Sequence, residues 1–307
     1  MPNFIVSTSI YEPTEATVKF CQKAGWQFIM VSDKKTPVDS YRELEKNYSN
    51  FRFFSCEEQE LKYPELSSAI GWNSIDRRNI GYIEALRSGA EIIATVDDDN
   101  IPYESWGENL LVGKKVEVDF YTTDQDFFDP LSVRNTPVWH RGYPIQCMSK
   151  RGDYAYRGKK KVFVHVQADL WDGDPDIDAI AREMYKPNIK FEDFSPYCTD
   201  KLTPFNSQNT FLHKSIFPNY MCIPHIGRMD DIWGGYLLQM LQKTNIVYCP
   251  ASVYQQRNPH EFMIDFNGEL IGYTDTLNFK NNWESTLPPK AKSAYDQYRK
   301  TITNEVK

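Results

Sequence analysis

Three aspartates and an asparagine, Asp97–Asn100, directly follow five β-prone residues, Ile92–Val96. Carboxylates at the end of a strand can cap the next helix, pair with an arginine or hold a divalent cation. In an extended segment residues i and i+2 point the same way, so Asp97 and Asp99 could face one ion while Asp98 faces elsewhere. Magnesium and manganese prefer such hard oxygen ligands and commonly share them with substrate phosphates. The pattern alone leaves metal binding, capping and simple solvation open.

The first third of the chain alternates short β-rich runs with segments of helical spacing. Strands are expected at 4–10, 26–33 and 91–96, and helices at 14–24 and within 74–90. Strands that alternate with helices predict an α/β fold with a mostly parallel sheet covered on both faces. Ligands of such sheets bind at the carboxyl ends of the strands. The segments SDKKTP and DDDN both lie at such ends.

The rest of the chain has a less regular hydrophobic pattern. Residues 103–197 are rich in Pro, Gly, Asp and aromatic residues, and we expect loops and a smaller antiparallel extension around the site there. A strand is expected at 162–170, a helix at 234–243 and another strand at 245–255. The polar tail from residue 287 predicts a surface helix or a frayed end. No linker composition divides the chain, so a single domain is expected.

Composition argues against several classes of protein. The 307 residues carry a formal net charge of −7, so neither a nucleic-acid backbone nor an anionic membrane surface is expected as the general partner. The six cysteines lie far apart without a CxxC pair, as in a reduced cytosolic protein. No run approaches the roughly 18 apolar residues of a transmembrane segment. A cytoplasmic protein is therefore expected, although a luminal domain excised from a larger protein would look the same.

Several segments, in order and at compatible spacing, resemble those of one family. They are GWQFIMVSDKKTP, WNSIDRRNIGYIEALRSGAEIIATVDDDN, RGYP, ADLWDGDPDIDAI, PFNSQNTFLHKSIFP and GRMDDIWGGY, and they cover most of 8–260. The chain resembles the STELLO-type nucleotide-sugar proteins, relatives of the reversibly glycosylated polypeptides that act as UDP-arabinopyranose mutases. The resemblance implies a GT-A (Rossmann-like) fold with a nucleotide-binding half at about 1–102, a sugar and acceptor half at about 103–275 and a tail at about 276–307. It also implies a nucleotide-sugar donor, UDP-sugar first, whose diphosphate an Mn²⁺ or Mg²⁺ ion bridges to the DDDN aspartates.

Two charged segments stand in the expected nucleotide-binding half. SDKKTP places Asp33, Lys34 and Lys35 just after a strand, and in similar proteins this loop contacts the nucleoside; a charged turn is the alternative. Arg77 and Arg78 precede the helix that leads to the acidic strand end. A guanidinium there could bind diphosphate in a bidentate manner, which we expect of one of the pair. An exposed arginine at a helix start is the alternative.

The motif RGYP contains Arg141, which matches the arginine that becomes glycosylated in the mutase relatives. Those relatives carry a second arginine seven positions later, where this chain has Met148. This departure argues against self-glycosylation and mutase activity. Arg141 is still expected to contact the donor phosphates, and a structural salt bridge is the alternative.

The segment WDGDPDIDAIAR alternates aspartates as a calcium loop does, but it lacks the terminal glutamate and contains an interrupting proline. The resemblance instead implies a loop that lines the sugar pocket, with Trp171 as a stacking surface and Asp172 or Asp174 accepting sugar hydroxyls. Asp178 is suited to cap the helix that follows. FNSQNT, which contains Asn209, suits the recognition of hydroxyl groups or forms a turn network.

The segment GRMDDIWGGY places Asp230 and Asp231 where inverting GT-A enzymes commonly carry the acidic residue that deprotonates the acceptor hydroxyl. Two acidic residues in a first helical turn, stabilised by the helix dipole, are the alternative. Many GT-A proteins complete the metal shell with a histidine after the last core strand. His260 stands at that position and is the third expected metal ligand.

These residues together predict a metal-dependent glycosyltransferase that moves a sugar from a nucleotide-sugar donor to a glycan or another hydroxyl acceptor. The first alternative is a UDP-sugar pyranose/furanose mutase. The second is a non-catalytic protein that binds a nucleotide sugar and organises other glycosyltransferases. A homo-oligomer is compatible with all three hypotheses, and the sugar and the acceptor are not encoded in any motif.

Overall fold

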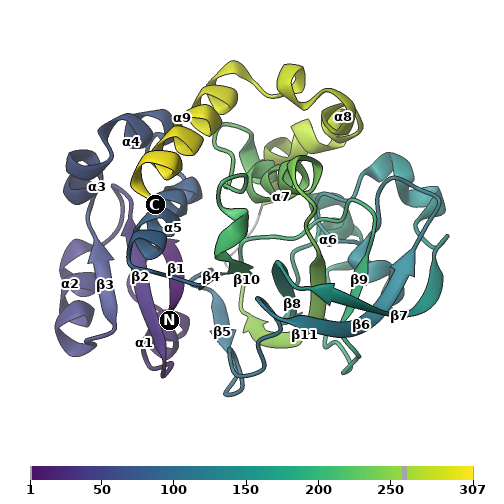
Figure 1. Cartoon of the computed structure of the whole chain (residues 1–307), viewed down its shortest axis with the longest axis horizontal. Helices are drawn as coiled ribbons and strands as arrows, with labels where there is room; N and C mark the ends of the chain where they lie inside the picture. The colour runs from purple at the N-terminus through teal and green to yellow at the C-terminus, as the bar shows by residue number, and fades with distance from the viewer. Residues whose placement is uncertain (1, 258–260, 307) are drawn as a thin grey trace.

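The computed structural model describes residues 2–257 and 261–306, which form an eleven-stranded sheet flanked by helices (Figure 1). The strands are β1 (Asn3–Ser9), β2 (Trp26–Ser32), β3 (Phe51–Phe54), β4 (Ile92–Val96), β5 (Asn100–Pro102), β6 (Lys115–Thr122), β7 (Ala155–Phe163), β8 (Val166–Gly173), β9 (Tyr197–Thr199), β10 (Asn209–His213) and β11 (Ile246–Gln255). The α-helices are α1 (Glu15–Cys21), α2 (Val38–Asn47), α3 (Cys56–Lys62), α4 (Pro64–Ile70), α5 (Arg78–Arg87), α6 (Ala179–Tyr185), α7 (Asp230–Leu241), α8 (Phe262–Thr286) and α9 (Pro289–Glu305).

The N-terminal half is a parallel sheet with the strand order β3-β2-β1-β4. β1 and β2 are buried along nearly their whole length, as expected when helices cover both faces of a parallel sheet. Ser9 pairs with Ser32, so the carboxyl ends of these two strands lie at the same edge, and β4 ends beside them. The predicted α/β fold with a Rossmann-like parallel half is confirmed.

The second half continues the same sheet with β10, β8, β11, β9, β6 and β7. β10 runs antiparallel to both β4 and β8, and the antiparallel pair β6 and β7 closes the far edge (Figure 1). The strand predicted at 162–170 is wrong in its bounds, because β7 ends at Phe163 and β8 begins at Val166. Between them Val164 exchanges backbone hydrogen bonds with the 113–114 turn, and this interrupts the run that the sequence presents as one strand.

The polar tail is a packed helix. α9 turns Ala294, Tyr295, Tyr298 and Ile302 inward and contacts α4 in the N-terminal half. A frayed end is therefore excluded, and the alternative of a helix is confirmed. α8, which sequence periodicity did not predict, contacts α6 and α7 and runs across the expected boundary at 275/276.

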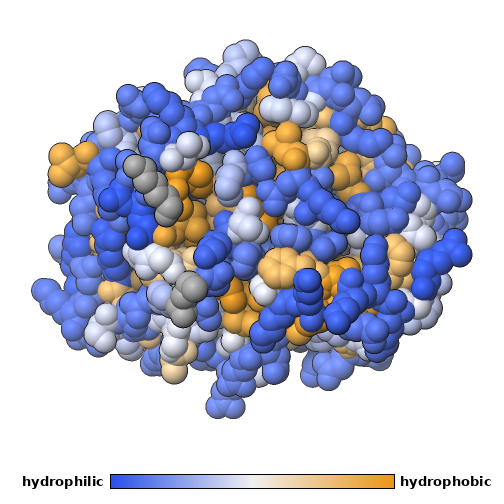
Figure 2. All heavy atoms as spheres, in the orientation of Figure 1, coloured by the Kyte–Doolittle hydropathy of each residue, from blue (hydrophilic) through white to orange (hydrophobic). Residues whose placement is uncertain are grey.

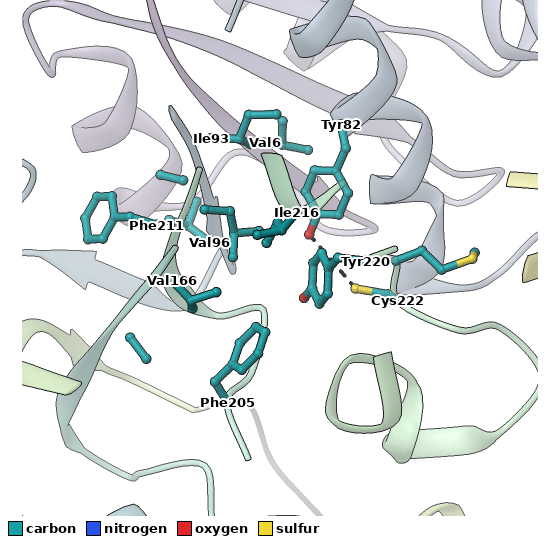
Figure 3. Close-up of a cluster of buried hydrophobic side chains, with 14 of the residues drawn as sticks. Val6, Tyr82, Ile93, Val96, Val166, Phe205, Phe211, Ile216, Tyr220 and Cys222 are labelled. Atoms are coloured by element: carbon teal, nitrogen blue, oxygen red, sulfur yellow. Dashed lines mark hydrogen bonds between the residues drawn. The ribbon is translucent and has the colours of Figure 1, made fainter. Parts of the chain in front are cut away.

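One buried cluster, which includes Ile93 and Val96 of β4, joins the two halves (Figure 3). Val6 of β1, Val96 of β4 and Tyr82 of α5 all have zero or nearly zero exposure. The Tyr82 hydroxyl donates to Thr95 Oγ1 at 2.9 Å and lies 3.9 Å from Cys222 Sγ. The end of β4 is therefore held by packing and by hydrogen bonds, which gives the residues that follow it a rigid base.

The surface of the face seen in Figure 2 is largely hydrophilic, with hydrophobic side chains in groups that hydrophilic ones separate. Within residues 2–257 and 261–306, no helix combines the length and the apolar composition that a transmembrane segment needs.

The contact of α5 with the sheet depends on Gly81. A Cβ atom at this position would lie 2.6 Å from Val6 Cγ1 and 2.7 Å from Val31 Cγ2. Alanine would gain about 1 kcal/mol of helix propensity, but overpacking a rigid core costs typically 1–3 kcal/mol. We expect Gly81→Ala to lower the free energy of unfolding by about 1 kcal/mol, measured by urea denaturation. Gly152→Ala is the control, because nothing lies within 4 Å of its Cβ position; equal stability of the two variants would contradict the close approach of α5.

Candidate active site

A cavity of about 730 Å³ opens at the edge where β1, β2 and β4 end. Its walls also include the segment 70–76, Arg78, the start of α7 and the residue Arg257 that follows β11. This is the position at which open α/β sheets bind their ligands. The predicted site residues that line it are Asp33, Lys35, Arg78, Asp97, Asp98, Asp99, Arg141, Asp230 and Asp231.

The acidic segment after β4 is a turn, so the alternation expected of an extended strand does not apply and all three aspartates line the cavity. Asp97 Oδ1 accepts a hydrogen bond of 2.7 Å from Arg78. Asp98 accepts one from the Ser9 hydroxyl. Asp99 Oδ1 is buried without a hydrogen-bond partner among the described residues. Burial, together with the charge of Asp97, raises the pKa of Asp99 to about 7, and burial raises the pKa of Asp98 to about 6.

The residues of this turn fit a divalent cation shared with phosphates. Asp99 carries an unsatisfied buried oxygen beside a second carboxylate, Asp97, and a cation would remove the repulsion between them. In the described part of the chain no group of three or more His, Cys, Asp or Glu side chains is arranged to hold a metal ion by itself. Magnesium-type ions often take only one or two protein carboxylates and complete their shell with water and substrate phosphates. The third predicted ligand, His260, lies outside the described residues.

The two adjacent arginines have different surroundings. Arg78 is buried under the acidic turn, where it donates to Asp97, to the Ser207 carbonyl at 2.6 Å and to the Ser207 hydroxyl at 2.9 Å. Arg77 points away from the cavity and donates to Gln59. Its guanidinium lies 3.7 Å from the centre of the Trp72 ring. Arg78 is therefore the member of the pair that faces the candidate ligand site.

Asp33 connects the end of β2 to the loop that precedes Arg77. Its carboxylate accepts backbone hydrogen bonds of 2.9 Å from both Asn73 and Ser74. Lys35 lines the cavity, whereas the Lys34 ammonium lies 5.3 Å from the Trp72 ring. Asp33 thus shapes the cavity wall, and Lys35 is the cation of this segment that a ligand can reach.

Arg141 lies between two buried carboxylates. Its Nε and Nη2 donate to the two oxygens of Asp176 at 2.8 Å each. Its terminal nitrogens also donate to the two oxygens of Asp231, at 3.1 and 3.2 Å. Because the side chain is only 5 % exposed, its cationic charge is balanced inside the protein. Arg141 therefore has the geometry of the alternative, a structural salt bridge, and it lies at the wall of the cavity.

Asp230 and Asp231 are adjacent and both buried, yet their pKa values move in opposite directions. Burial raises the pKa of Asp231, but Arg141 and the hydrogen bonds from Ser207 outweigh it and lower the net value. Burial raises the pKa of Asp230 well above its ordinary value, and the charges of Asp76 and Asp231 add to the rise. Burial likewise raises the pKa of Asp76 to about 6.

The residues predicted to surround the sugar are placed away from the cavity. Trp171, Asp172 and Asn209 lie on buried strands and are absent from its described lining. Asp172 accepts hydrogen bonds from the Tyr103 hydroxyl at 2.8 Å and the Phe191 amide at 2.9 Å, and Asn209 accepts one from the Trp106 indole at 3.0 Å. Asp174 pairs with Arg182 at a separate pocket of about 280 Å³. Asp178 caps α6 by accepting from the Ala181 amide.

The residues that escaped the sequence analysis include Trp72, Asp76, Asp176 and Arg257. Asp176 belongs to the acidic segment WDGDPDID, and Asp76 directly precedes Arg77, so both motifs contained a signal. Arg257 stands three positions before His260 in QQRNPH. Trp72 had no signal beyond its place in the segment that resembles the family.

Comparison with known proteins finds similar sequences and similar solved structures. No family model matches the chain. It is 25% identical over 277 residues to "Probable glycosyltransferase STELLO2" of Arabidopsis thaliana, with 81% of this chain and 35% of the relative covered. It is 26% identical over 282 residues to "Probable glycosyltransferase STELLO1" of the same plant, with 81% and 34% covered. The chain thus spans about a third of the length of these relatives.

Among solved structures, the chain is similar to the mannosyltransferase PcManGT from Pyrobaculum calidifontis, solved in complex with GDP-Man and Mn²⁺. The TM-score is 0.41 at 10% sequence identity, over 98% of this chain and 75% of that chain. At this TM-score the similarity adds nothing to the fold described above. The sequence similarity is the informative finding: over 81% of its length the chain is similar to the two proteins named as probable STELLO glycosyltransferases.

Proposed function

We propose that this protein is a metal-dependent glycosyltransferase of the GT-A type that transfers a sugar from a nucleotide-sugar donor, UDP-sugar first, to an acceptor hydroxyl. The observation that carries the proposal is the acidic turn at the end of β4, where Asp99 presents an unsatisfied buried oxygen to a cavity that also contains arginines. Such a cavity is suited to a diphosphate held by a cation. The names of the homologous relatives support the same reaction class.

Asp97 and Asp99 would hold the Mn²⁺ or Mg²⁺ ion, with His260 as a further proposed ligand. When bound, the ion would supply positive charge to the departing nucleoside diphosphate. Arg78 fixes Asp97 in place through its 2.7 Å hydrogen bond and keeps positive charge beneath the phosphates. Asp33 and Lys35 line the same cavity and would contact the nucleoside.

Asp230 is the better candidate for the base that takes the proton from the acceptor hydroxyl. A general base works best when its pKa lies near the operating pH, and burial beside Asp76 and Asp231 moves the pKa of Asp230 upward. Asp231 is held ionised by Arg141 and so acts as a positioning residue. In the reaction the acceptor oxygen bonds to the anomeric carbon, the carbon–oxygen bond to the phosphate breaks, and the electron pair leaves with the nucleoside diphosphate.

The mutase alternative requires an arginine that can accept a sugar. Arg141 donates from Nε and from both terminal nitrogens to carboxylates or carbonyls, and its side chain is 5 % exposed. An arginine in this state is a poor nucleophile because its nitrogens are engaged and its charge is stabilised. The geometry therefore favours transfer to an external hydroxyl. Binding of a nucleotide sugar without release of the nucleotide would favour the scaffold alternative.

Asp99→Ala tests the metal assignment. We expect UDP with Mn²⁺ to stabilise the wild-type protein but not the variant, because a ligand that binds only the native state raises its apparent stability. Without ligand its melting temperature should equal or exceed that of the wild type, since the buried repulsion from Asp97 is relieved. Asp124→Ala, at an exposed position away from the cavity, is the control. Unchanged stabilisation by UDP and Mn²⁺ in the Asp99 variant would contradict the assignment.

Asp230→Asn tests the assignment of the base. Loss of a general base typically lowers kcat by about 10² to 10⁴-fold, and the binding of UDP with Mn²⁺ should be retained. The measurement is UDP release from a UDP-sugar in the presence of an acceptor mixture, or UDP-sugar hydrolysis where no acceptor is known. A variant that keeps the wild-type rate would exclude Asp230 as the base.

Asp76→Asn tests whether the charge of Asp76 raises the pKa of Asp230, through the pH dependence of stability and rate. The folded-state pKa of Asp76 is raised to about 6, so its ionisation destabilises the fold as the pH rises from about 4 through 6. The variant should gain on the order of 1 kcal/mol over the wild type at pH 8 and nothing at pH 4, measured by thermal unfolding. Because the charge of Asp76 raises the pKa of Asp230, the acidic limb of the rate profile should move to lower pH. An equal difference in stability at both pH values would contradict the shifted pKa of Asp76.

A further inference from the structure

The cavity walls contain four arginines within the described residues, and three of them are occupied by carboxylates of the protein. Each of these three forms short hydrogen bonds or ion pairs with fixed neighbours, so its charge is already balanced. Arg78 pairs with Asp97, Arg141 with Asp176 and Asp231, and Arg228 with Asp265 and Glu269.

Arg257 differs from the other three. Its side chain is 5 % exposed, and its ion-pair distances are 3.6 Å to Asp174 and 3.8 Å to Asp176. Both carboxylates are closer to another arginine, Arg182 or Arg141. Nε has no hydrogen-bond partner in residues 2–257 and 261–306, and the terminal nitrogen Nη2 donates only a long bond of 3.5 Å to the Asp174 carbonyl. A buried guanidinium with so few partners is costly unless a ligand anion completes its surroundings.

The backbone places Arg257 beside the acidic turn. β11 pairs with β5, so that Gln255 lies opposite Asn100, and the Gln256 amide donates to the Asp99 carbonyl at 3.0 Å. Arg257 is the next residue in the chain. It also acts electrostatically on Asp99, whose carboxyl group has the unsatisfied oxygen. A phosphate held at the acidic turn by a cation would therefore have Arg257 as a neighbour.

We propose that Arg257 binds the terminal phosphate of the nucleoside diphosphate and so recognises the leaving group of the donor. This inference rests on the proposed function. It means that Arg257 makes the protein bind a nucleoside diphosphate more tightly than a monophosphate. When the bond from the anomeric carbon to the phosphate oxygen breaks, the electron pair stays on that oxygen and the terminal phosphate gains negative charge. A guanidinium, which is permanently charged and can donate two parallel hydrogen bonds, suits this role.

The test compares nucleotides that differ by one phosphate. Calorimetric titration of the wild-type protein with UDP and UMP, each with Mn²⁺, should give tighter binding of the diphosphate; GDP and GMP are titrated in parallel. Arg257→Gln should weaken UDP binding by about tenfold or more, the usual loss for a hydrogen bond to a charged group, and leave UMP binding within about twofold. Arg257→Lys, which keeps the charge but not the fork geometry, should lie between the two.

Arg182→Gln is the matched control, because Arg182 pairs with the same Asp174 but lines the separate smaller pocket. It should leave the binding of both nucleotides unchanged. Equal weakening of UDP and UMP by Arg257→Gln, or no weakening of either, would overturn the proposal. A wild-type protein that binds neither UDP nor GDP would instead overturn the proposed function. Melting temperatures of the three variants separate a loss of contact from a loss of folding, and Arg257→Lys keeps the test decisive if the glutamine variant unfolds.

Discussion

The ion pairs of Arg141 are the interaction on which the cavity wall depends. One guanidinium joins the segment before β7, the loop after β8 and the first turn of α7, which are far apart in the sequence. Two buried carboxylates would repel each other and unfold this junction without it, whereas bidentate geometry to Asp176 and contacts to both oxygens of Asp231 balance them. The arginine therefore contributes to the site mainly by setting the positions and the charge of other residues.

This arrangement divides two adjacent aspartates into different chemical states. Asp231 faces Arg141 and Ser207 and remains ionised, while Asp230 faces Asp76 and resists ionisation. Carboxyl groups whose environments push their pKa values apart are typical of sites that need one fixed charge and one group that exchanges a proton. The helix dipole at the start of α7 acts on both residues, so the difference between them comes from their side-chain neighbours.

Much of the parallel half could be predicted from the sequence, because apolar periodicity and turn residues are local signals. β1, β2, β4 and α5 stand close to their expected bounds. The acidic turn, Arg78, Arg141 and the Asp230–Asp231 pair could also be named, since each belongs to a recognisable motif. Their partners could not. Asp176 forms its ion pair with Arg141 across 35 residues of chain. Trp171 and Asn209 are buried on their strands away from the cavity, because tertiary packing decides which face of a strand meets the cavity.

The buried polar atoms of the site that lack hydrogen-bond partners indicate the composition of its ligand. Asp76 Oδ1, Asp99 Oδ1, Gln208 Oε1 and Arg257 Nε are buried without hydrogen-bond partners in the described structure, and all four residues line the same cavity. Folded proteins seldom retain such groups, because each costs about 1–3 kcal/mol. Four of them around one space fit a ligand with both cationic and anionic parts. A diphosphate with its metal ion has that composition, with the cation matching Asp99 and the phosphate matching Arg257. These groups lower the stability of the unliganded fold, and a ligand that pairs with them recovers that free energy on binding.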